Sequence, residues 1–414
     1  MMNLFSSSGS DDRARLRILA PTRYVWTFSG PRRSRHKVIR KPFVPFSRID
    51  QRIEGLTVFP PTGKRIDLVH AFNRVPIGTK PFVIGFESHL PRAFGTKKSR
   101  PYRWMIRTLV SQRCRSIVAI SEFAKNNFLH DLRHCTDDEA RTLQSKVVVR
   151  LPSVRSVAPT IPPKPSATAG LRLLFVGSHF ARKGGCVALR IAELAHERGL
   201  PITLDIVSDY QVGAISWTDP TNPDYYTDYW KLRSLPNVRC HGACPNDVVL
   251  SLMESAHVVL LPTFGDTFGF SAIEALAAGV PVLATTQGAL PEFLVDGGNS
   301  ILLDLPTKKS GEWEWLGHPR RDSTEFEVAH RSAVEALAQR SIERLAAVAA
   351  DDAGYRRMAA AARQTALDLF DPELANAFWD DTYVRAHAMG RGLAGGFAEV
   401  DLSAAGSPGM VLDA

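Results

Sequence analysis

The sequence lacks any long hydrophobic run and has few cysteines. No stretch of about 18 residues is apolar throughout, which excludes a helix that spans a bilayer. Within residues 1–17 no apolar segment precedes the charged residues, so we expect no secretory signal. The expected location is cytoplasmic, with the inner face of the membrane as the alternative place. The five cysteines are odd in number and scattered, which fits reduced thiols better than a disulfide framework.

The rest of the composition is that of an ordinary globular protein. Its 414 residues are too many for one typical domain and predict two or three. With 44% hydrophobic, 22% charged and 9% aromatic residues, collagen-like, disordered and polytopic membrane classes are excluded. Cys240 and Cys244 flank His241, but no second ligand pair follows at zinc spacing, so we expect a strand and its turn there.

The net charge of +9 is unevenly distributed. Basic residues exceed acidic ones by 19 in residues 1–160, whereas acidic residues exceed basic ones by 10 in the remainder, which suggests domains with different partners. The basic residues form two groups: Arg32, Arg33, Arg35, Lys37, Arg40 and Lys41, and then Lys97, Lys98, Arg100, Arg103 and Arg107. They are either a solvated surface or a site for anionic lipid headgroups.

A proline-rich segment divides the chain into two α/β halves. Residues 157–170 contain four prolines within seven residues and predict a stiff linker. On both sides, short apolar runs alternate with helical patterns, so the fold class is α/β with doubly wound parallel sheets. Residues 306–326 show no periodicity and predict an exposed loop that carries Trp313 and Trp315. Three helices follow, and Asp371 and Pro372 mark the start of the last.

Residues 257–305 carry the clearest functional pattern. A buried strand ends at Pro262, a loop holds Asp266, and a helix begins near Ser271 with Glu274 on its first turn. Ligands of open α/β sheets bind at the carboxyl ends of strands, and a helix N-terminus there attracts an anion. Asp266 could accept hydrogen bonds from sugar hydroxyls and Glu274 from a vicinal diol, although an acidic residue in this place can equally be a helix cap.

A second anion-binding pattern follows the linker. The strand of residues 171–177 ends in a glycine turn, and Arg182 and Lys183 precede the next helix. Two cations beside a helix N-terminus can neutralise a diphosphate, whereas the plain alternative is a solvated helix start.

These motifs together resemble those of the retaining GT-B glycosyltransferases. The resemblance rests on Asp266, Phe268-Gly269, Glu274, Ala277-Ala278-Gly279-Val280-Pro281-Val282, Gly288-Ala289-Leu290-Pro291-Glu292, Asp296-Gly297 and Lys183-Gly184. It is strong over residues 171–305, moderate over 116–154 and faint before residue 90. Two positions depart from the family pattern: Asp266 replaces the usual glutamate, and Ser178 replaces an arginine.

The resemblance implies two Rossmann-like domains that face each other across a cleft. Residues 13–156 would bind the acceptor, 171–370 the donor, and a helix over 371–389 would cross back to the first domain. Residues 390–414 are rich in glycine, alanine and serine, and we expect them and residues 1–12 to be disordered tails. The implied catalytic residues are His89, Asp266 and Lys183. The implied donor-binding residues are Gly177, Arg182, Lys183, Phe268, Gly269, Phe270 and Glu274, and the acceptor side holds Glu87, Arg92 and Lys125.

The implied activity is transfer of a hexose from a UDP- or GDP-sugar to a glycan or lipid-linked acceptor, with retention of configuration. No Asp-x-Asp metal signature occurs at a strand end, so we expect no metal and no other cofactor. A nucleotide-sugar epimerase of the same architecture is one alternative. A nucleic-acid-binding protein is another, but the aromatic residues do not interleave with the basic ones and no binding motif occurs, so we expect no nucleic-acid partner.

Overall fold

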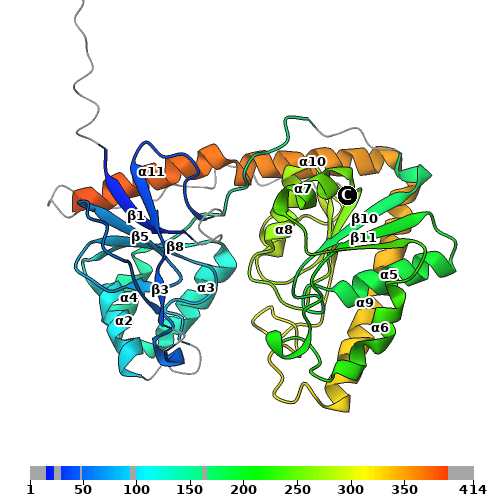
Figure 1. Cartoon of the computed structure of the whole chain (residues 1–414), viewed down its shortest axis with the longest axis horizontal. Coiled ribbons are helices and arrows are strands. Elements are labelled where there is room, and N and C mark those ends of the chain that lie inside the picture. The colour runs from blue at the N-terminus through cyan, green and yellow to red at the C-terminus, as the bar shows by residue number, and fades with distance from the viewer. Residues whose placement is uncertain (1–14, 23–28, 47–48, 94–98, 161–165, 390–414) are drawn as a thin grey trace, which may run out of the picture.

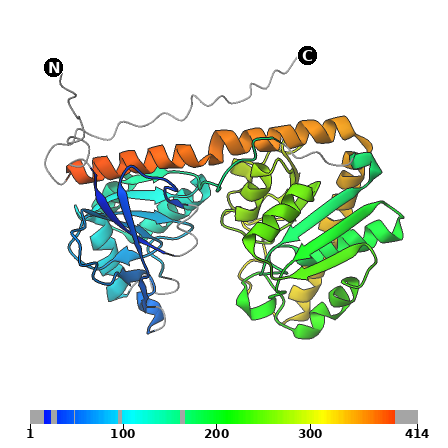
Figure 2. The same cartoon turned by 45° about the horizontal axis from the view of Figure 1, so that its top comes forward.

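The computed structural model describes residues 15–22, 29–46, 49–93, 99–160 and 166–389. They form two α/β domains side by side, and two helices in line with each other run along one edge of both domains (Figure 1, Figure 2). The predicted α/β class with two parallel sheets is confirmed. The predictions for residues 1–12 and 390–414 lie outside the described residues.

The N-terminal domain is built on a six-stranded parallel sheet in the order β2-β1-β5-β7-β8-β9. The strands are β1 (Arg17–Pro21), β2 (Lys37–Lys41), β5 (Leu68–Phe72), β7 (Phe82–Phe86), β8 (Cys114–Ala119) and β9 (Val147–Val149). Three short strands, β3 (Val44–Pro45), β4 (Leu56–Val58) and β6 (Val75–Pro76), form a second sheet. The helices are α2 (Arg100–Val110), α3 (Glu122–Asp131) and α4 (Asp137–Gln144).

Strand β2 has the sequence KVIRK, so it lacks the short apolar run from which the other strands are predicted. It pairs only with β1, so it lies at the edge of the sheet, and its residues are half-buried or exposed. An edge strand of this kind needs no buried apolar run, and charged side chains protect it against pairing with other chains. Lys37, Arg40 and Lys41 therefore belong to a strand as well as to a basic group.

The C-terminal sheet has the order β12-β11-β10-β13-β14-β15 and is also parallel throughout. Its strands are β10 (Leu171–Val176), β11 (Ile202–Val207), β12 (Val238–Gly242), β13 (Val258–Leu261), β14 (Val282–Thr285) and β15 (Ser300–Leu303). The helices between them are α5 (Gly185–Glu197), α6 (Thr227–Leu232), α7 (Asn246–Ser255) and α8 (Phe270–Ala277). The strand order reverses between β10 and β13, which is where open sheets of this type bind ligands.

Three helices complete the chain: α9 (Thr324–Ala350), α10 (Asp352–Phe370) and α11 (Pro372–Ala388). Helix α9 packs on α5 and α10 packs on α8, whereas α11 lies against β5, β7 and β8 of the N-terminal domain. The Asp371 carboxylate accepts a hydrogen bond from the Glu373 amide at 2.7 Å, and Pro372 is the first helical residue, so the predicted start of this helix is confirmed.

The two faces of the N-terminal sheet are covered by different helices. Val83 and Val118 pack in one cluster with α11 residues such as Trp379, whereas their sequence neighbours Ile84 and Ile117 belong to the core that contains α2 and α3. Side chains alternate between the faces of a strand, so a single sheet serves both layers. No described helix is both long and apolar enough to cross a membrane.

The prediction of an exposed loop at residues 306–326 is wrong for one of its tryptophans. Trp315 is half-buried, but Trp313 is only 1% exposed. The Trp313 ring packs edge-on against Phe264 at 4.8 Å between centroids and contacts Phe326 and His330 of α9. A loop can contribute a core residue without a periodic pattern, because one large ring fills the space between neighbouring elements.

Candidate functional site

The loops that follow the two central strands of the C-terminal sheet meet at an ion pair. Lys183 follows β10, Asp266 follows β13, and these strands are neighbours. The Lys183 ammonium contacts the Asp266 carboxylate, and the two side chains are 17% and 8% exposed. Burial by itself raises the pKa of Asp266, but Lys183 and Arg182 outweigh it and hold that pKa below its usual value. The site thus contains an ionised carboxylate beside a lysine.

The loop after β10 is shaped to bring the lysine to this place. A Cβ atom on Gly177 would lie 3.0 Å from Cγ of Lys183, so glycine leaves room for the lysine stem. Arg182 donates a hydrogen bond to the Gly265 carbonyl at 2.8 Å, and Thr263 donates one to the Arg182 carbonyl. Arg182 therefore joins the two loops. Its guanidinium has a protein partner, the Gly265 carbonyl, and its role in binding a diphosphate stays a prediction.

Helix α8 begins beside this ion pair. Gly269 precedes it with φ +88°, a backbone conformation that favours glycine. The first amides of a helix lack partners within the helix and attract anions. Ser271 Oγ is buried and has no hydrogen-bond partner in the described part of the chain. The Phe268 ring is fully buried, stacked on Phe293 at 5.3 Å, so only its backbone can face a ligand, whereas Phe270 is half-buried.

Glu274 lies on α8 next to two arginines of other segments. Burial raises the pKa of its carboxyl to about 7, and Arg155 and Arg32 act against that rise. The Arg32 guanidinium donates to the Val154 carbonyl at 2.6 Å and the Ser153 carbonyl at 3.0 Å. The sequence places Arg32 in a basic surface group, but the structure directs it inward, toward the segment that joins the two domains.

The residues predicted for the acceptor side lie on the N-terminal domain, and one of them contacts the loop that carries Asp266. Glu87 follows β7, and its carboxylate accepts hydrogen bonds from Asn73 Nδ2 at 3.1 Å and from Thr267 Oγ1 at 3.3 Å. Thr267 is adjacent to Asp266, so Glu87 connects the N-terminal domain to the site described above.

The other three predicted residues of the N-terminal domain have partners of their own. His89 Nδ1 lies 3.3 Å from Oδ2 of Asp131 in α3. Arg92 lies 3.6 Å from the Glu54 carboxylate. The Lys125 ammonium lies 3.2 Å from the Glu122 carboxylate, one turn earlier in α3. Ser121 caps α3, because its Oγ accepts a hydrogen bond from the Ala124 amide.

Sequence reasoning missed four residues near these groups: Asn73, Arg155, His179 and Thr267. Asn73 has φ +58°, unusual for a residue other than glycine, and its side chain accepts the Glu87 amide at 3.0 Å. His179 lies near Lys183 and Asp266, and its Nδ1 is buried without a hydrogen-bond partner among the described residues. Each is a single polar residue in a loop, and no spacing pattern marks such residues.

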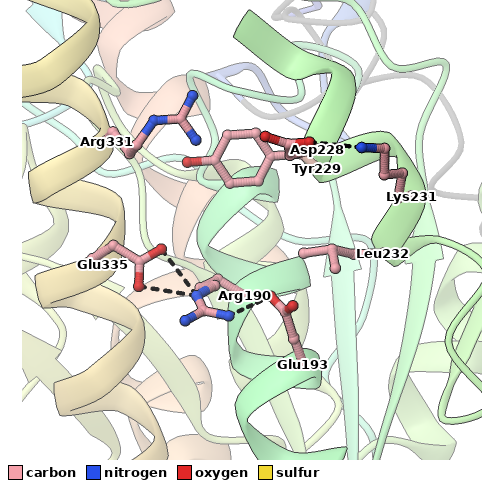
Figure 3. Close-up of a pocket in the computed structure, with 8 residues that line it drawn as sticks. All are labelled: Arg190, Glu193, Asp228, Tyr229, Lys231, Leu232, Arg331 and Glu335. Carbon is pink, nitrogen blue, oxygen red and sulfur yellow. Dashed lines mark hydrogen bonds and ion pairs between the residues drawn. The ribbon is translucent and has the colours of Figure 1, made fainter.

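The chain also has a cavity of about 320 Å³ away from these loops, between α5, α6 and α9. Its charged side chains mostly neutralise each other: Arg190 binds Glu335 and Glu193, and Lys231 binds Asp228 (Figure 3).

Within the described ranges no group of three or more His, Cys, Asp or Glu side chains could hold a metal. His241 binds Asp205, with 2.6 Å between Nε2 and Oδ1.

Sequence comparison finds a similarity to a known family over part of the chain. Residues 170–310 match the model of the glycosyl transferases group 1. D-inositol 3-phosphate glycosyltransferase of Paenarthrobacter aurescens is 31% identical over 132 residues, which are 32% of this chain and 31% of the relative. The enzyme of the same name from Corynebacterium diphtheriae is 40% identical over 132 residues, 32% and 30% of the two chains. The match thus spans about a third of these relatives.

Structure comparison covers nearly the whole chain. A glycosyltransferase from Rickettsia africae superimposes with a TM-score of 0.55 at 15% identity, over 90% of this chain and 98% of the other. Anabaena HepE in complex with UDP-glucose gives a TM-score of 0.55 at 13% identity, over 89% and 100%. The comparisons favour neither the epimerase nor the nucleic-acid-binding alternative. The protein therefore has the two-domain GT-B fold, and its residues 170–310 are similar to the glycosyl transferases group 1.

Proposed function

We propose that the protein is a retaining glycosyltransferase that moves a hexose from a UDP- or GDP-sugar to a glycan or lipid-linked acceptor, in polysaccharide or glycolipid synthesis. One observation carries the proposal: Lys183, Asp266 and the N-terminus of α8 converge at the carboxyl ends of the central strands, within the residues that match the family. The relatives named above are glycosyltransferases, and HepE binds UDP-glucose, which supports this class of donor.

In the proposed reaction each of these groups has a separate role. The bond between the sugar C1 and the diphosphate oxygen breaks, a bond from C1 to the acceptor oxygen forms, and the acceptor proton passes to the departing phosphate. Negative charge grows on the leaving diphosphate, where Lys183 and the α8 amides stabilise it. Asp266 accepts hydrogen bonds from the sugar hydroxyls, Glu274 binds the ribose diol, and His89 lies close to the transferred sugar from the other domain.

A thermal-shift screen of nucleotide sugars tests the proposal. A ligand at about 100 times its dissociation constant stabilises the folded state by about 2.7 kcal/mol, which raises the melting temperature by a few degrees. We expect a UDP- or GDP-sugar to raise it, and the free nucleoside diphosphate to do so as well. No shift with any nucleotide sugar at millimolar concentration would contradict the proposal.

We also predict that transfer needs no divalent metal. A positive helix end and Lys183 take the place of a cation at the diphosphate. Excess EDTA should leave the rate of transfer within a factor of about two. A tenfold loss that magnesium or manganese restores would overturn this part of the mechanism.

A lipid-linked acceptor would bring the protein to the inner face of the membrane, and one surface of the N-terminal domain suits an anionic bilayer. Helix α2 exposes Arg100, Trp104 and Arg107 on one side, with Trp104 40% exposed. The other basic group lies elsewhere, because the backbone amides of Arg32 and Arg33 donate hydrogen bonds to Asn376 Oδ1 of α11, which covers the opposite face of the sheet. Lys97 and Lys98 lie outside the described residues.

This membrane prediction is tested by co-sedimentation with liposomes. Each basic residue near an anionic surface contributes about 1 kcal/mol, so replacing Arg100 and Arg107 by alanine should weaken binding about tenfold or more. High salt should weaken binding of the unchanged protein as well. Arg239→Ala, an exposed position on β12, is the control and should bind normally. Binding that ignores lipid charge and salt, or no binding at all, would leave a soluble acceptor.

A further inference from the structure

Glu292 connects the C-terminal domain to the start of a helix in the other domain. Its Oε2 accepts the Glu122 amide at 2.9 Å and its Oε1 accepts the Phe123 amide at 2.6 Å, and these are the first two residues of α3. Ser121 of the N-terminal domain already binds the Ala124 amide. A carboxylate that binds two helix-end amides forms strong, charge-assisted hydrogen bonds at the positive end of the helix.

The segment that carries Glu292 is packed against residues 266–269, which form the donor loop of the proposed mechanism. A Cβ atom on Gly288 would lie 1.9 Å from the Asp266 carbonyl oxygen, and one on Gly269 would lie 2.5 Å from Leu290 Cδ2. Phe293 stacks on Phe268, whose neighbour Gly269 precedes α8. These contacts leave little space between residues 288–293 and 266–269, so the two segments must move together.

The donor loop itself makes a second contact with the N-terminal domain, the hydrogen bond from Thr267 to Glu87. Asn73 holds Glu87 from both sides, since it donates to the carboxylate and accepts the amide. The Asp266 loop is thus attached to the N-terminal domain directly through Thr267 and indirectly through Glu292. Both attachments lie outside the groups that the proposed mechanism places on the donor.

We propose that Glu292 is a positioning residue that binds the first two amides of α3 and so keeps the donor loop at a fixed position relative to the N-terminal domain during transfer. These two hydrogen bonds are called the clasp. This inference rests on the proposed function for its kinetic consequence, but the clasp itself is a property of the two domains. Glu292 touches no reacting atom in this account. It acts through α3 on one side and through residues 266–269 on the other.

The kinetic test compares Glu292→Ala and Glu292→Gln with the unchanged enzyme. Hydrogen bonds to a charged group are strong enough that losing both should lower kcat for the acceptor reaction about tenfold to a hundredfold. The dissociation constant of UDP or GDP should stay within about threefold, because the donor groups belong to the C-terminal domain. Glutamine keeps one acceptor oxygen and should give an intermediate kcat. Glu254→Ala, at an exposed position of α7, should change neither quantity.

Small-angle X-ray scattering of the ligand-free proteins tests the clasp without any activity. Glu292→Ala should increase the radius of gyration relative to the unchanged protein and to Glu254→Ala. An unchanged radius together with an unchanged kcat would overturn the proposal, as would equal losses of kcat and nucleotide affinity. If the unchanged protein binds no nucleotide but Glu292→Ala still has the larger radius of gyration, the proposed function is contradicted. The role of the clasp in joining the two domains is then supported. Should Glu292→Ala not fold, Glu292→Gln carries both measurements.

Discussion

Replacing Lys183 by alanine should lower turnover by about two to three orders of magnitude, as when a single charge-stabilising group is removed from an active site. Lys183 is the cation in contact with Asp266 at the end of β10, and in the proposed mechanism it neutralises the departing diphosphate. Release of nucleoside diphosphate measures the effect with any acceptor, water included.

The Lys183→Ala variant also leaves Asp266 without its partner, and a buried carboxylate left alone costs several kcal/mol. The double variant Lys183→Ala with Asp266→Asn separates the two effects, because it should recover much of the melting temperature but none of the turnover. Lys231→Ala, on the outer surface at α6, is the matched control and should be as active as the unchanged protein. Full activity in a folded Lys183→Ala protein would remove the lysine from the mechanism.

Replacing Glu274 by alanine should lower kcat/KM about a hundredfold through the loss of the diol contact. The pKa of Glu274 is about 7, so its carboxyl is half ionised near neutral pH. The ionised form is the better acceptor for two hydroxyls. kcat/KM of the unchanged enzyme should therefore rise between about pH 6 and pH 8 and then level off. Glu274→Gln keeps the shape of the side chain but should lose this pH dependence; a rise that persists in Glu274→Gln would assign the titration to another group.

From the raised pKa of Glu274 we also predict that the free energy of unfolding falls as the pH rises, whereas kcat/KM rises. Its pKa is higher in the folded state than the ordinary value of 4.5, so the folded state holds the proton more tightly. The contribution of this raised pKa to the free energy of unfolding is complete below about pH 4.5, and it is lost as the pH rises toward 7. Glutamine cannot ionise, so above pH 7 Glu274→Gln should be the more stable protein, by about 3 kcal/mol at most. Urea unfolding at pH 5 and pH 8 measures the difference. If Glu274→Gln were less stable than the unchanged protein at pH 8, the claim that burial of ionised Glu274 destabilises the folded state would be contradicted.

The parallel sheets could be predicted from the sequence for a physical reason. Central strands such as β13 are buried on both faces, so they read as unbroken apolar runs, and the residues after them mark the ligand side. Lys183 and Asp266 were predicted from separate motifs, and the structure brings them into contact. Strand β2 escaped prediction because an edge strand needs no apolar run, and the burial of Trp313 because its partners are far away in the sequence.

The contacts between the domains could not be predicted from the sequence. Glu292 belongs to a recognised motif, but its partners, the amides of Glu122 and Phe123, lie about 170 residues earlier. Backbone amides leave no trace in the residue pattern, so a bond between a side chain and a distant helix end is visible only in the folded chain. Arg32 shows the same limit, because nothing in a run of arginines indicates which one turns inward.

Isothermal titration of UDP and GDP into the unchanged protein, Lys183→Ala and Glu274→Ala tests the central claim most directly. We predict that one nucleotide binds with one site per chain. Its dissociation constant should rise at least about tenfold in each variant, a loss of roughly 1.4 kcal/mol or more, and should stay unchanged in Lys231→Ala. If neither nucleotide binds, or if one binds equally well without Lys183 and without Glu274, the ends of β10 and β13 are not the donor site.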